Sequence, residues 1–378
     1  MKQSEFKELV QVLSLFASAR ENADGPESMI GVQVSGGVAK LIAGKGAAGV
    51  VVTLDGETTG KFAYTVDARP MLQSAKVITG KQEVTLTAAE DGVTIRTSEG
   101  GQVFLKASGR LQEAGYAKKP KTFVARAVVP GGAFSQIAKV FDAIHGDFEI
   151  EAPSAQMLDG EAHFVCVTPV KEKRALYAHF QTDGEMLEPE IKDYHAAGYP
   201  VFWRSLKHFD SDGIIEWGED GTRAVSGPYE LYSGSWRVSP YNPKTRRSET
   251  PRHPDPWPIM ALSGQPSVAF TIDKKVLIEA VKGVMPNDEH GRIVLAVKDG
   301  FVNISAFGSE DGMTVPAAST KHTGHRACDS ALLLTMVRAM DGKQVTIGWA
   351  QQPAMILSAP EMAGWTILLA PVALSAGD

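Results

Sequence analysis

The sequence predicts an α+β protein in which one helix-plus-strands unit is repeated six times, with two units to a domain. The first observation is a recurring unit of roughly 50 residues along the 378-residue chain. The second is a set of apolar residues at helical spacing in each unit, and the third is period-two alternation in the segments that follow. One helix cannot cover both faces of a sheet, so the units are expected to pair into three domains.

Two distant segments show the repeat directly. Residues 66–108 and 328–371 both run helix, Gly-Lys-Gln, alternating strand, turn, strand, turn, strand. The Gly-Lys-Gln runs, at 80–82 and 342–344, stand at the same helix-to-strand corner. A glycine just past a helix typically takes a left-handed conformation that closes the last carbonyls, and we expect both glycines to do so.

The same pattern places the helices and strands. The expected helices cover 4–20, 67–79, 131–145, 202–210, 273–285 and 329–341. Two of them have clear apolar stripes, formed by Phe134, Ile137, Ala138 and Phe141 in the third helix and by Val276, Leu277, Ala280, Val281 and Val284 in the fifth. Alternation at 83–87 and 301–305 predicts strands with one buried face.

Two polar connecting segments mark the domain boundaries. Residues 109–121 and the Pro-rich, basic residues 242–258 are expected to be linkers, and 181–199 is expected to be a loop insertion. The three domains are then assigned to 1–115, 116–260 and 261–378.

Composition limits the classes of function. The chain is 43% hydrophobic and 22% charged, as in ordinary soluble proteins, and its net charge of −6 requires that any nucleic-acid binding come from a local basic surface. The first ten residues lack the apolar core of a signal peptide, and no apolar run is long enough to span a bilayer. Two cysteines, Cys166 and Cys328, do not suit a disulfide scaffold. We therefore expect a cytoplasmic protein.

Several short motifs then suggest a family. Residues 270–307 run helix, short loop and a strand pair around Asp-Gly, and the other motif segments are VDARPML (66–72), MLDGEAHF (157–164), SGPYELYS (226–233) and ILLAPVAL (367–374). Together with the three doubled domains, these segments resemble the bacterial β sliding clamp family, the DNA polymerase III beta subunit. The family's Thr-Asp-Gly-His-Arg-Leu-Ala loop has a longer counterpart without histidine at 168–176. Ala370 and Ala373 replace the usual methionine and arginine of the last strand. We interpret the chain as a divergent member, with a phage as one origin that would fit.

The resemblance implies the DNA clamp fold, with three similar tandem domains that form a head-to-tail homodimer ring. It implies a processivity factor that encircles double-stranded DNA without sequence specificity and tethers the replicative polymerase and other replication and repair proteins. A clamp loader is the further expected partner. No enzymatic activity, cofactor, metal or membrane association is expected.

The DNA-contacting residues implied are basic side chains on the polar faces of the helices: Arg20, Arg69, Lys76, Lys139, Arg204, Lys207, Lys275, Lys282 and Arg338. Polar helix faces are often merely solvated, and the clamp architecture is what favours a DNA role for them. The resemblance also implies an apolar pocket for a partner peptide, made by Leu158, Arg174, Leu176, Leu368, Leu369, Pro371 and Val372. Leu368 and Leu369 are alternatively core residues at a strand end. The ring interface implied comprises Val103, Phe104, Leu105, Val284 and Met285.

Other interpretations are weaker. His322, His325 and Cys328 are ligand types at short intervals, but a structural zinc site needs a fourth ligand that the neighbouring sequence lacks. His163 and Cys166 lie an odd number of residues apart on one expected strand, so they point to opposite faces and do not form a nucleophile pair. The competing class of function is a structural or interaction protein with the same fold that does not encircle DNA.

Overall fold

The structure is a computed structural model. The residues that it describes are 1–20, 25–56, 58–78, 81–145, 153–158, 160–167, 176–188, 194–197, 200–234, 241–242, 247–248, 266–284, 291–309, 311–319, 323–349 and 354–369. The chain divides into two compact units, and each is described by itself. Unit 1 comprises Met1–Ser135, Met186–Ile191 and Gly198–Trp236, and unit 2 comprises Gln136–Glu185, Lys192–Ala197 and Arg237–Asp378.

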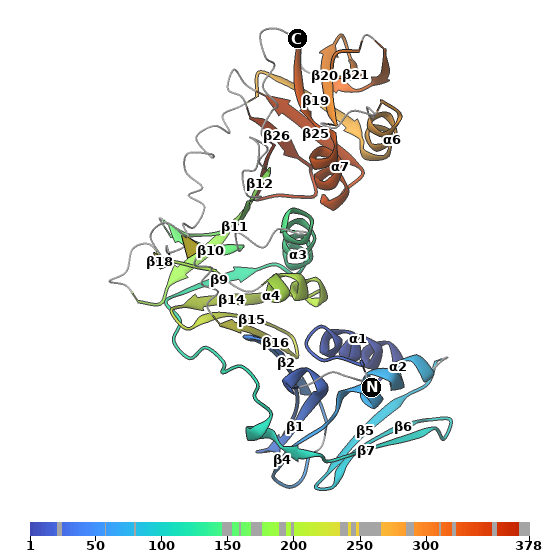
Figure 1. Cartoon of the computed structure of the whole chain (residues 1–378), viewed down its shortest axis with the longest axis vertical. Helices are drawn as coiled ribbons and strands as arrows, with labels where there is room; N and C mark the ends of the chain where they lie inside the picture. Colours follow the sequence, from blue (N-terminus) through green and yellow to red (C-terminus); the bar gives the residue numbers. More distant parts are fainter. Residues whose placement is uncertain are drawn as a thin grey trace. The chain divides into compact units, whose positions relative to one another are not determined.

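Six repeats of a helix followed by three antiparallel strands form the framework (Figure 1). Repeats 1 to 3 are α1 (Gln3–Ser14) with β1 (Met29–Ser35), β2 (Val38–Lys45) and β3 (Ala48–Leu54); α2 (Ala68–Val77) with β5 (Val84–Ala89), β6 (Gly92–Thr97) and β7 (Gln102–Lys106); and α3 (Gly131–His145) with β10 (Ser154–Leu158), β11 (Glu161–Val167) and β12 (Leu176–Met186). Repeats 4 to 6 are α4 (Pro200–Ser205) with β14 (Gly213–Gly218), β15 (Gly221–Ser226) and β16 (Tyr229–Gly234); α6 (Lys274–Val284) with β20 (Arg292–Lys298), β21 (Phe301–Ala306) and β22 (Gly312–Pro316); and α7 (Ser330–Ala339) with β25 (Gln344–Trp349), β26 (Met355–Ser358) and β27 (Trp365–Leu369). The predicted sixfold repeat is confirmed.

A leading strand precedes every helix after the first, and it pairs with the first strand of a neighbouring repeat. These strands are β4 (Phe62–Asp67), β9 (Ala125–Val129), β13 (Tyr194–Ala197), β19 (Val268–Asp273) and β24 (Gly324–Asp329). Their partners are β1, β14, β10, β25 and β20 respectively. Repeats 3 and 4 therefore exchange leading strands with each other, and so do repeats 5 and 6.

Each unit contains one long antiparallel sheet and one short one. Sheet 1, in unit 1, has the order β8-β4-β1-β2-β3-β16-β15-β14-β9, where β8 is Gly109–Arg110. Sheet 2, in unit 2, has the order β13-β10-β11-β12-β27-β26-β25-β19-β23, where β23 is Ala318–Ser319. The short sheets are β5-β6-β7 in unit 1 and β22-β21-β20-β24 in unit 2. A further two-stranded ribbon joins β17 (Tyr241–Asn242) to β18 (Arg247–Ser248).

In each long sheet, two repeats are joined through their third strands. At the first junction, β3 pairs with β16 from Ala48↔Ser233 to Val52↔Tyr229. At the second, β12 pairs with β27 from Leu176↔Leu369 to Phe180↔Trp365. Both junctions are antiparallel, so a backbone ladder makes each pair of repeats continuous.

Residues 111–124, which we call the strap, cross the first junction on the outer face of sheet 1. Leu111 begins a short 3-10 helix, Leu111–Glu113, and Tyr116 lies over Gly44, where an added Cβ would stand 2.8 Å from the tyrosine ring. The Tyr116 hydroxyl donates to the Met29 carbonyl at 3.0 Å. The predicted linker is therefore a packed segment, because the glycines in β1 and β2 leave room for its side chains.

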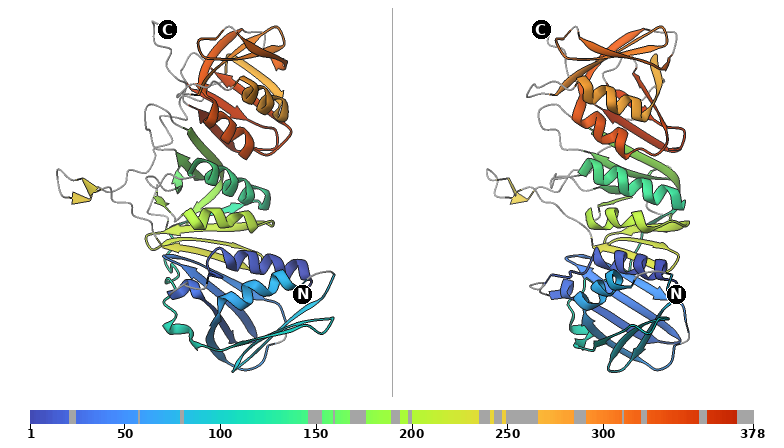
Figure 2. Two further views of the ribbon diagram at one scale, coloured as in Figure 1. Left: turned by 45° about the vertical axis from the view of Figure 1, so that its right-hand side comes forward. Right: turned by 90° about the vertical axis from the view of Figure 1, so that its right-hand side faces the viewer.

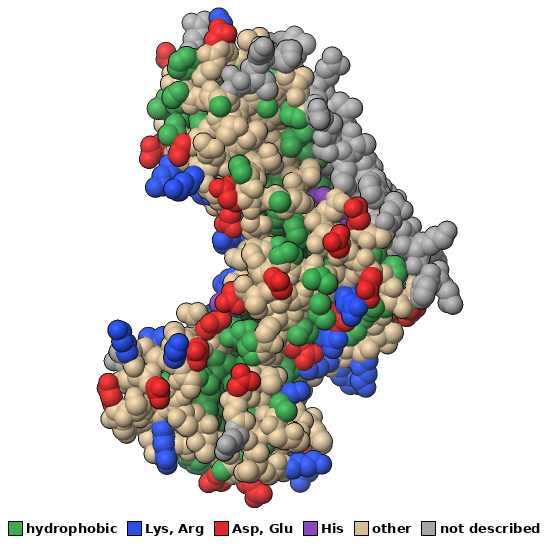
Figure 3. Space-filling view, turned by 180° about the vertical axis from the view of Figure 1, so that it is seen from behind, with side chains coloured by type: hydrophobic (Ala, Val, Ile, Leu, Met, Phe, Trp, Pro, Cys, Tyr) green, Lys and Arg blue, Asp and Glu red, His purple; other side chains and the backbone are tan. Residues whose placement is uncertain are grey.

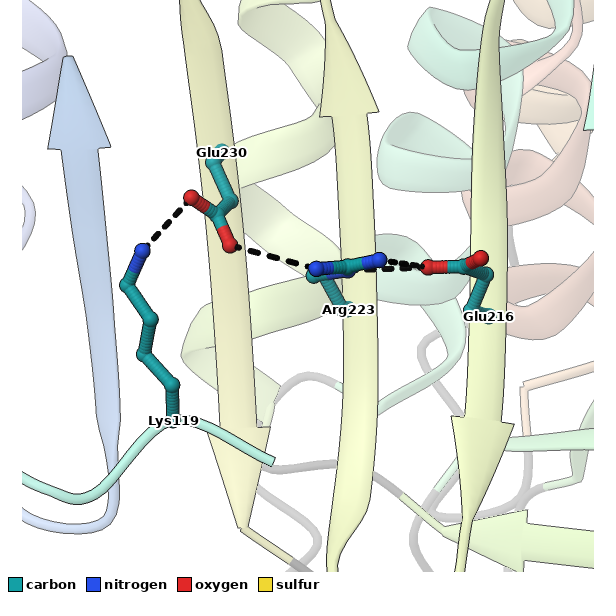
Figure 4. A network of polar contacts seen from close by, with 4 residues as sticks. All are labelled: Lys119, Glu216, Arg223 and Glu230. Atoms are coloured by element: carbon teal, nitrogen blue, oxygen red, sulfur yellow. Dashed lines mark hydrogen bonds and ion pairs between the residues drawn. The ribbon is translucent and has the colours of Figure 1, made fainter. Parts of the chain in front are cut away.

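Beyond Tyr116, Lys119 of the strap begins a row of four charged side chains. The other three stand on β16, β15 and β14 (Figure 4). Lys119 donates to Glu230 at 2.6 Å, and Arg223 lies between Glu230, at 3.7 Å, and Glu216, whose Oε2 accepts from its Nε at 2.8 Å. The Arg223 guanidinium also lies 4.6 Å from the centre of the Phe123 ring. Positive and negative groups alternate along this row, so each is next to an opposite charge.

Helices cover one face of the long sheet in each unit. In unit 1, α1, α2 and α4 lie on the same side of sheet 1, and in unit 2 α6 and α7 lie together on one side of sheet 2 (Figure 2). Their inward residues, such as Phe6, Leu13 and Trp203, are at most 1% exposed. The predicted stripe of α3 is likewise buried at all four positions. These packed faces fix which side chains each helix turns outward.

Aspartates begin three of the helices in the same way. Asp67, Asp273 and Asp329 precede α2, α6 and α7, and each carboxylate accepts the backbone N–H two residues later, at 2.8, 2.8 and 2.9 Å. An aspartate here satisfies helix donors that have no intrahelical partner. The similarity among these repeats therefore includes the residue that caps the helix.

Several expected boundaries differ from the structure. The first helix ends at Ser14, not at residue 20, and the Ser14 hydroxyl donates to the Gln11 carbonyl at 2.7 Å, which competes with helix continuation. The fourth is α4 followed by a 3-10 turn, Leu206–His208, in place of one helix over 202–210. Part of 181–199 is not a loop, because β12 continues to Met186 and β13 follows.

Two local predictions about α6 and α7 are also wrong. Val276 is 38% exposed and lies outside the buried stripe of α6, which consists of Leu277, Ala280 and Val281. Gly342 has a φ of +100°, but α7 ends at an extended Met340, so the glycine turns the chain into β25. Lys274 closes the helix instead, since its ammonium donates to the Met340 carbonyl and, at 3.3 Å, to the Arg338 carbonyl. Gly80 lies outside the described residues.

No helix in the described ranges is long and apolar enough to cross a membrane.

Candidate nucleic-acid interface and partner site

A basic groove of about 610 Å³ lies between α1 and α2 in unit 1. Lys7, Arg20 and Lys76 line it, with no carboxylate among its lining residues. Its floor is apolar, with Val10 and Leu72. A groove with three cations and no acid attracts anions, and phosphate oxygens are the anions a nucleic acid offers. Two of the predicted DNA-contacting residues therefore share one site.

Arg69 lies at the start of α2, beside this groove. It lines a smaller hollow of about 270 Å³ together with Arg20 and Asp67. The side chain of Asp67 caps α2, so its charge is directed to backbone N–H groups. In the same unit, Arg204 and Lys207 are exposed and one helical turn apart. All five predicted unit 1 cations thus reach the surface on or next to helices.

In unit 2 three of the predicted cations are exposed, and the fourth is exposed but forms an ion pair. Lys275, Lys282 and Arg338 are exposed on α6 and α7. Lys139 on α3 is also exposed, but its ammonium lies 2.8 Å from the Asp341 carboxylate. Burial lowers the pKa of the nearby Lys274, Asp341 raises it, and Lys139 lowers it further. Charge is therefore partly neutralised where α3, α6 and α7 meet.

The surface does not carry one sign of charge. On the face seen in Figure 3, Lys and Arg side chains are interspersed with Asp and Glu side chains. A surface of this kind binds DNA through a few local cations and not through a strong overall field.

The predicted partner pocket falls at one end of the second junction. Leu176 pairs with Leu369, and Leu368 packs with Val165 and Tyr177. Leu176 and Leu369 are 0% exposed and Leu368 is 3% exposed. In the described structure these three leucines are therefore core residues at strand ends, which is the alternative that the sequence left open for Leu368 and Leu369.

The structure does not bring Leu158 together with those leucines. Leu158 pairs with Glu161, and Glu161 pairs with Asp183, seven residues along β12 from Leu176. At about 3.3 Å per residue this is roughly 23 Å. The motif at 157–164 matches a hairpin turn between β10 and β11, and short turn motifs do not fix which end of a sheet they occupy. The side chain of Leu158 and all of Arg174, Pro371 and Val372 lie outside the described residues.

A buried histidine pair, which sequence reasoning missed, adjoins this site. His163 on β11 and His179 on β12 are each 1% exposed, with Nδ1 and Nε2 2.7 Å apart and the rings stacked. His179 also stacks on Tyr177. Burial, and then the charge of His163, lower the pKa of His179 to about 4. The odd spacing from Cys166 does place His163 on the opposite strand face, but its partner is sixteen residues away and no local motif identifies it.

The predicted ring interface includes an edge strand. β7 is the last strand of its sheet, and Phe104 on it is 50% exposed, whereas Leu105 is only 3% exposed and belongs to the core of unit 1. Val103 is half-buried. Val284, at the end of α6, is half-buried as well, and Met285 lies outside the described residues. Phe104 is thus the residue of the set most available to a partner.

Both cysteines are buried, and neither forms a disulfide. Among the described residues, no group of three or more His, Cys, Asp or Glu side chains could hold a metal ion. His322, part of the interpretation set aside above, lies outside those residues.

No protein-family model matches this sequence, and no curated protein sequence does either. Solved structures match over nearly the whole chain. A DnaN sliding clamp (DNA polymerase III subunit beta) of Pseudomonas aeruginosa bound to griselimycin is 13% identical, with a TM-score of 0.72 and coverage of 99% of this chain and 98% of that one. The DNA polymerase III beta subunit of Thermotoga maritima is 11% identical, with a TM-score of 0.69 and 99% of both chains covered.

A Helicobacter pylori beta clamp bound to a DNA ligase peptide is 13% identical, with a TM-score of 0.68 and coverage of 99% of this chain and 100% of that one. Identities this low establish architecture and not activity. The chain has the DNA clamp fold of the bacterial DNA polymerase III beta subunits, as the sixfold repeat and the two long sheets require.

Proposed function

We propose that this chain is a non-catalytic DNA sliding clamp that encircles duplex DNA and tethers a replicative polymerase. The observation that carries the proposal is the clamp fold over 99% of the chain, with neighbours that are clamps over their full length. The basic groove between α1 and α2 adds a local anion-binding surface to an otherwise acidic protein. A fold-level analogy needs this kind of site-level support before it bears on function.

DNA would be held by weak, salt-dependent phosphate contacts from Arg20, Arg69, Lys76, Lys139, Arg204, Lys207, Lys275, Lys282 and Arg338. Such contacts do not read sequence, and they exchange easily, so they permit sliding. A closed ring then supplies the long residence time that the contacts themselves do not.

The ring would be a head-to-tail homodimer of three domains per protomer, with boundaries at 1–115, 116–260 and 261–378. The exchange of leading strands between paired repeats supports this division. The exposed edge of β7 with Phe104 is the unit 1 side of the proposed interface, together with Val103 and Leu105, and the end of α6 at Val284 and Met285 is the other side. Pairing an edge strand also protects it from unwanted association.

Partner proteins would dock a short linear segment at the end of the second junction. Leu176, Leu368 and Leu369 would lie buried beneath the docked segment, and Arg174, Pro371 and Val372 are next to them in the chain. The Helicobacter pylori neighbour was solved with a DNA ligase peptide, which supports a peptide site in clamps of this fold. The polymerase, other replication and repair proteins and a clamp loader are the partners that we propose.

Retention on a plasmid tests the proposal. With a clamp loader and ATP, the protein should elute with nicked circular DNA and be lost when the circle is linearised, because only a topological link depends on free ends. Phe104→Arg should convert a dimer to a monomer in sedimentation and abolish retention, whereas Val38→Arg, at an exposed apolar residue elsewhere in unit 1 (38% exposed), should not. Equal retention on circular and linear DNA would instead favour a clamp-fold protein that does not encircle DNA.

A further inference from the structure

A cluster of charged groups in unit 2 is not explained by DNA contact alone. It consists of Lys139 on α3, Lys274 at the start of α6, Arg338 on α7 and Asp341, just after α7. The Lys139 ammonium and the Asp341 carboxylate lie 2.8 Å apart, and their side chains are 47% and 36% exposed. This ion pair connects two repeats that are far apart in the sequence.

The two lysines of the cluster bind different partners. Lys274 donates to the carbonyls of Arg338 and Met340 and so closes the C-terminal end of α7, where cations are favoured by the helix dipole. Lys139 makes no such structural bond to a helix end in the contacts described here. Its partner is a carboxylate, the protein group closest in charge and hydrogen-bonding capacity to a phosphate.

We propose that Asp341 acts as a brake on DNA binding by occupying Lys139 in place of a backbone phosphate. The inference rests on the proposed clamp function and adds a residue that sets how strongly the clamp holds DNA. A phosphate that reaches Lys139 must displace Asp341, so this cation contributes little net affinity. Arg338, exposed on the same helix end, remains a direct contact.

The brake suits a protein that must slide. Each phosphate neutralised by a lysine releases about one counterion and adds about 0.9 to the magnitude of the slope of log K against log salt. A cation already paired within the protein releases fewer counterions when DNA arrives, so affinity and salt dependence both stay lower. Half-exposure keeps the pair reachable by DNA without making it a fixed part of the core.

A double-mutant cycle on a short linear duplex tests this with the full-length chain. Binding is measured by fluorescence anisotropy from about 50 to 200 mM salt. We expect Asp341→Asn to raise affinity several-fold and to steepen the salt slope by about one counterion. Lys139→Ala should change little in the original protein and should remove the whole gain in the Asp341→Asn background.

Asp311→Asn is the matched control, because Asp311 is exposed in the turn before β22 and its loss changes the net charge equally. It should leave the salt slope unchanged, and thermal melting should show that all four variants fold. Equal gains from Asp311→Asn and Asp341→Asn, or additive effects of the two cluster substitutions, overturn the brake. The proposed clamp function fails instead if the original protein is not retained on nicked circular plasmid, a result that the duplex assay does not measure, which separates the two ideas.

Discussion

The two junctions of the long sheets use one backbone design with different side chains. Each joins the third strands of two repeats in antiparallel register over five residue pairs. At the first junction the outer face is crossed by the strap, with its row of alternating charges. At the second, aromatic rings and two stacked histidines fill the space around β12 and β27.

This difference shows which conditions each junction should resist. Ion pairs that are partly exposed weaken with salt but tolerate mild acid. A buried histidine pair is indifferent to salt but cannot accept protons without bringing charge into the interior. The two junctions should therefore fail under different conditions, and three substitutions can show whether they do.

The largest effect is expected from Trp365→Ala. Trp365 is 7% exposed, lies 5.2 Å from the Phe180 ring centre and donates from Nε1 to Gln136 at 2.9 Å. Removing a buried indole typically costs about 3–5 kcal/mol, measured as the change in the free energy of urea unfolding. Tyr229→Ala, at one end of the first junction and only half-buried, should cost clearly less. Equal losses in the free energy of unfolding for the two substitutions would contradict the expected difference between the junctions.

Arg223→Met should have an intermediate effect on the first junction. It leaves Glu216, which is 6% exposed, without the cation of its ion pair and removes one neighbour of Glu230. Breaking a fully buried pair costs about 3–5 kcal/mol, and the 31% exposure of Arg223 reduces our expectation to about 2 kcal/mol. Lys119→Met is the control at the exposed end of the row and should cost below about 1 kcal/mol. A Lys119 effect as large as that of Arg223 would show that the strap, not the inner pair, dominates.

The smallest expected effect is the change in the free energy of unfolding per pH unit, which we assign to the second junction. The pKa of His179 is lowered to about 4, below its unfolded value of about 6.5, so the unfolded chain binds more protons between those values. Stability is therefore present above pH 6.5 and is lost as the pH falls, by up to about 1.4 kcal/mol per pH unit.

Urea midpoints at pH 7 and pH 5 measure this loss, and His179→Gln should reduce it. His208 in unit 1 also has a lowered pKa, through burial and then Lys207, but it is less buried than His179, so His208→Gln should reduce the loss less. An unchanged pH dependence in His179→Gln would place the acid sensitivity elsewhere.

The repeat could be predicted because it rests on local periodicity. Apolar spacing located all six helices, and the alternation at 301–305 predicted β21, whose buried positions include Val302 and Ile304. Helix ends were less predictable, since Ser14 and Lys274 act through hydrogen bonds that a sequence pattern does not specify. The strap was predicted only as a linker, because glycines on distant strands create the space for Tyr116.

The candidate sites show the same difference between features set by local sequence and features set by long-range packing. Exposure of the helix cations follows from amphipathicity, which is a local property, and it was predicted correctly for Lys76 and Lys282. The Lys139–Asp341 pair and the histidine pair join residues from different strands or repeats, so they depend on register and packing. Leu158 was misplaced for that reason, because its distance from Leu176 depends on how β10 and β12 are each aligned with β11.

The strap also bears on how the chain would respond to a protease. The parts of unit 1 before and after the strap are held together twice, once covalently through the strap and once by the ladder between β3 of repeat 1 and β16 of repeat 4. A cut between Ala117 and Lys118 would remove only the covalent route. The fragments would stay associated through the ladder, so a nicked chain would elute as an intact one until denaturant is added. The same arrangement makes the loop at this position a natural place to split the protein into two complementing halves.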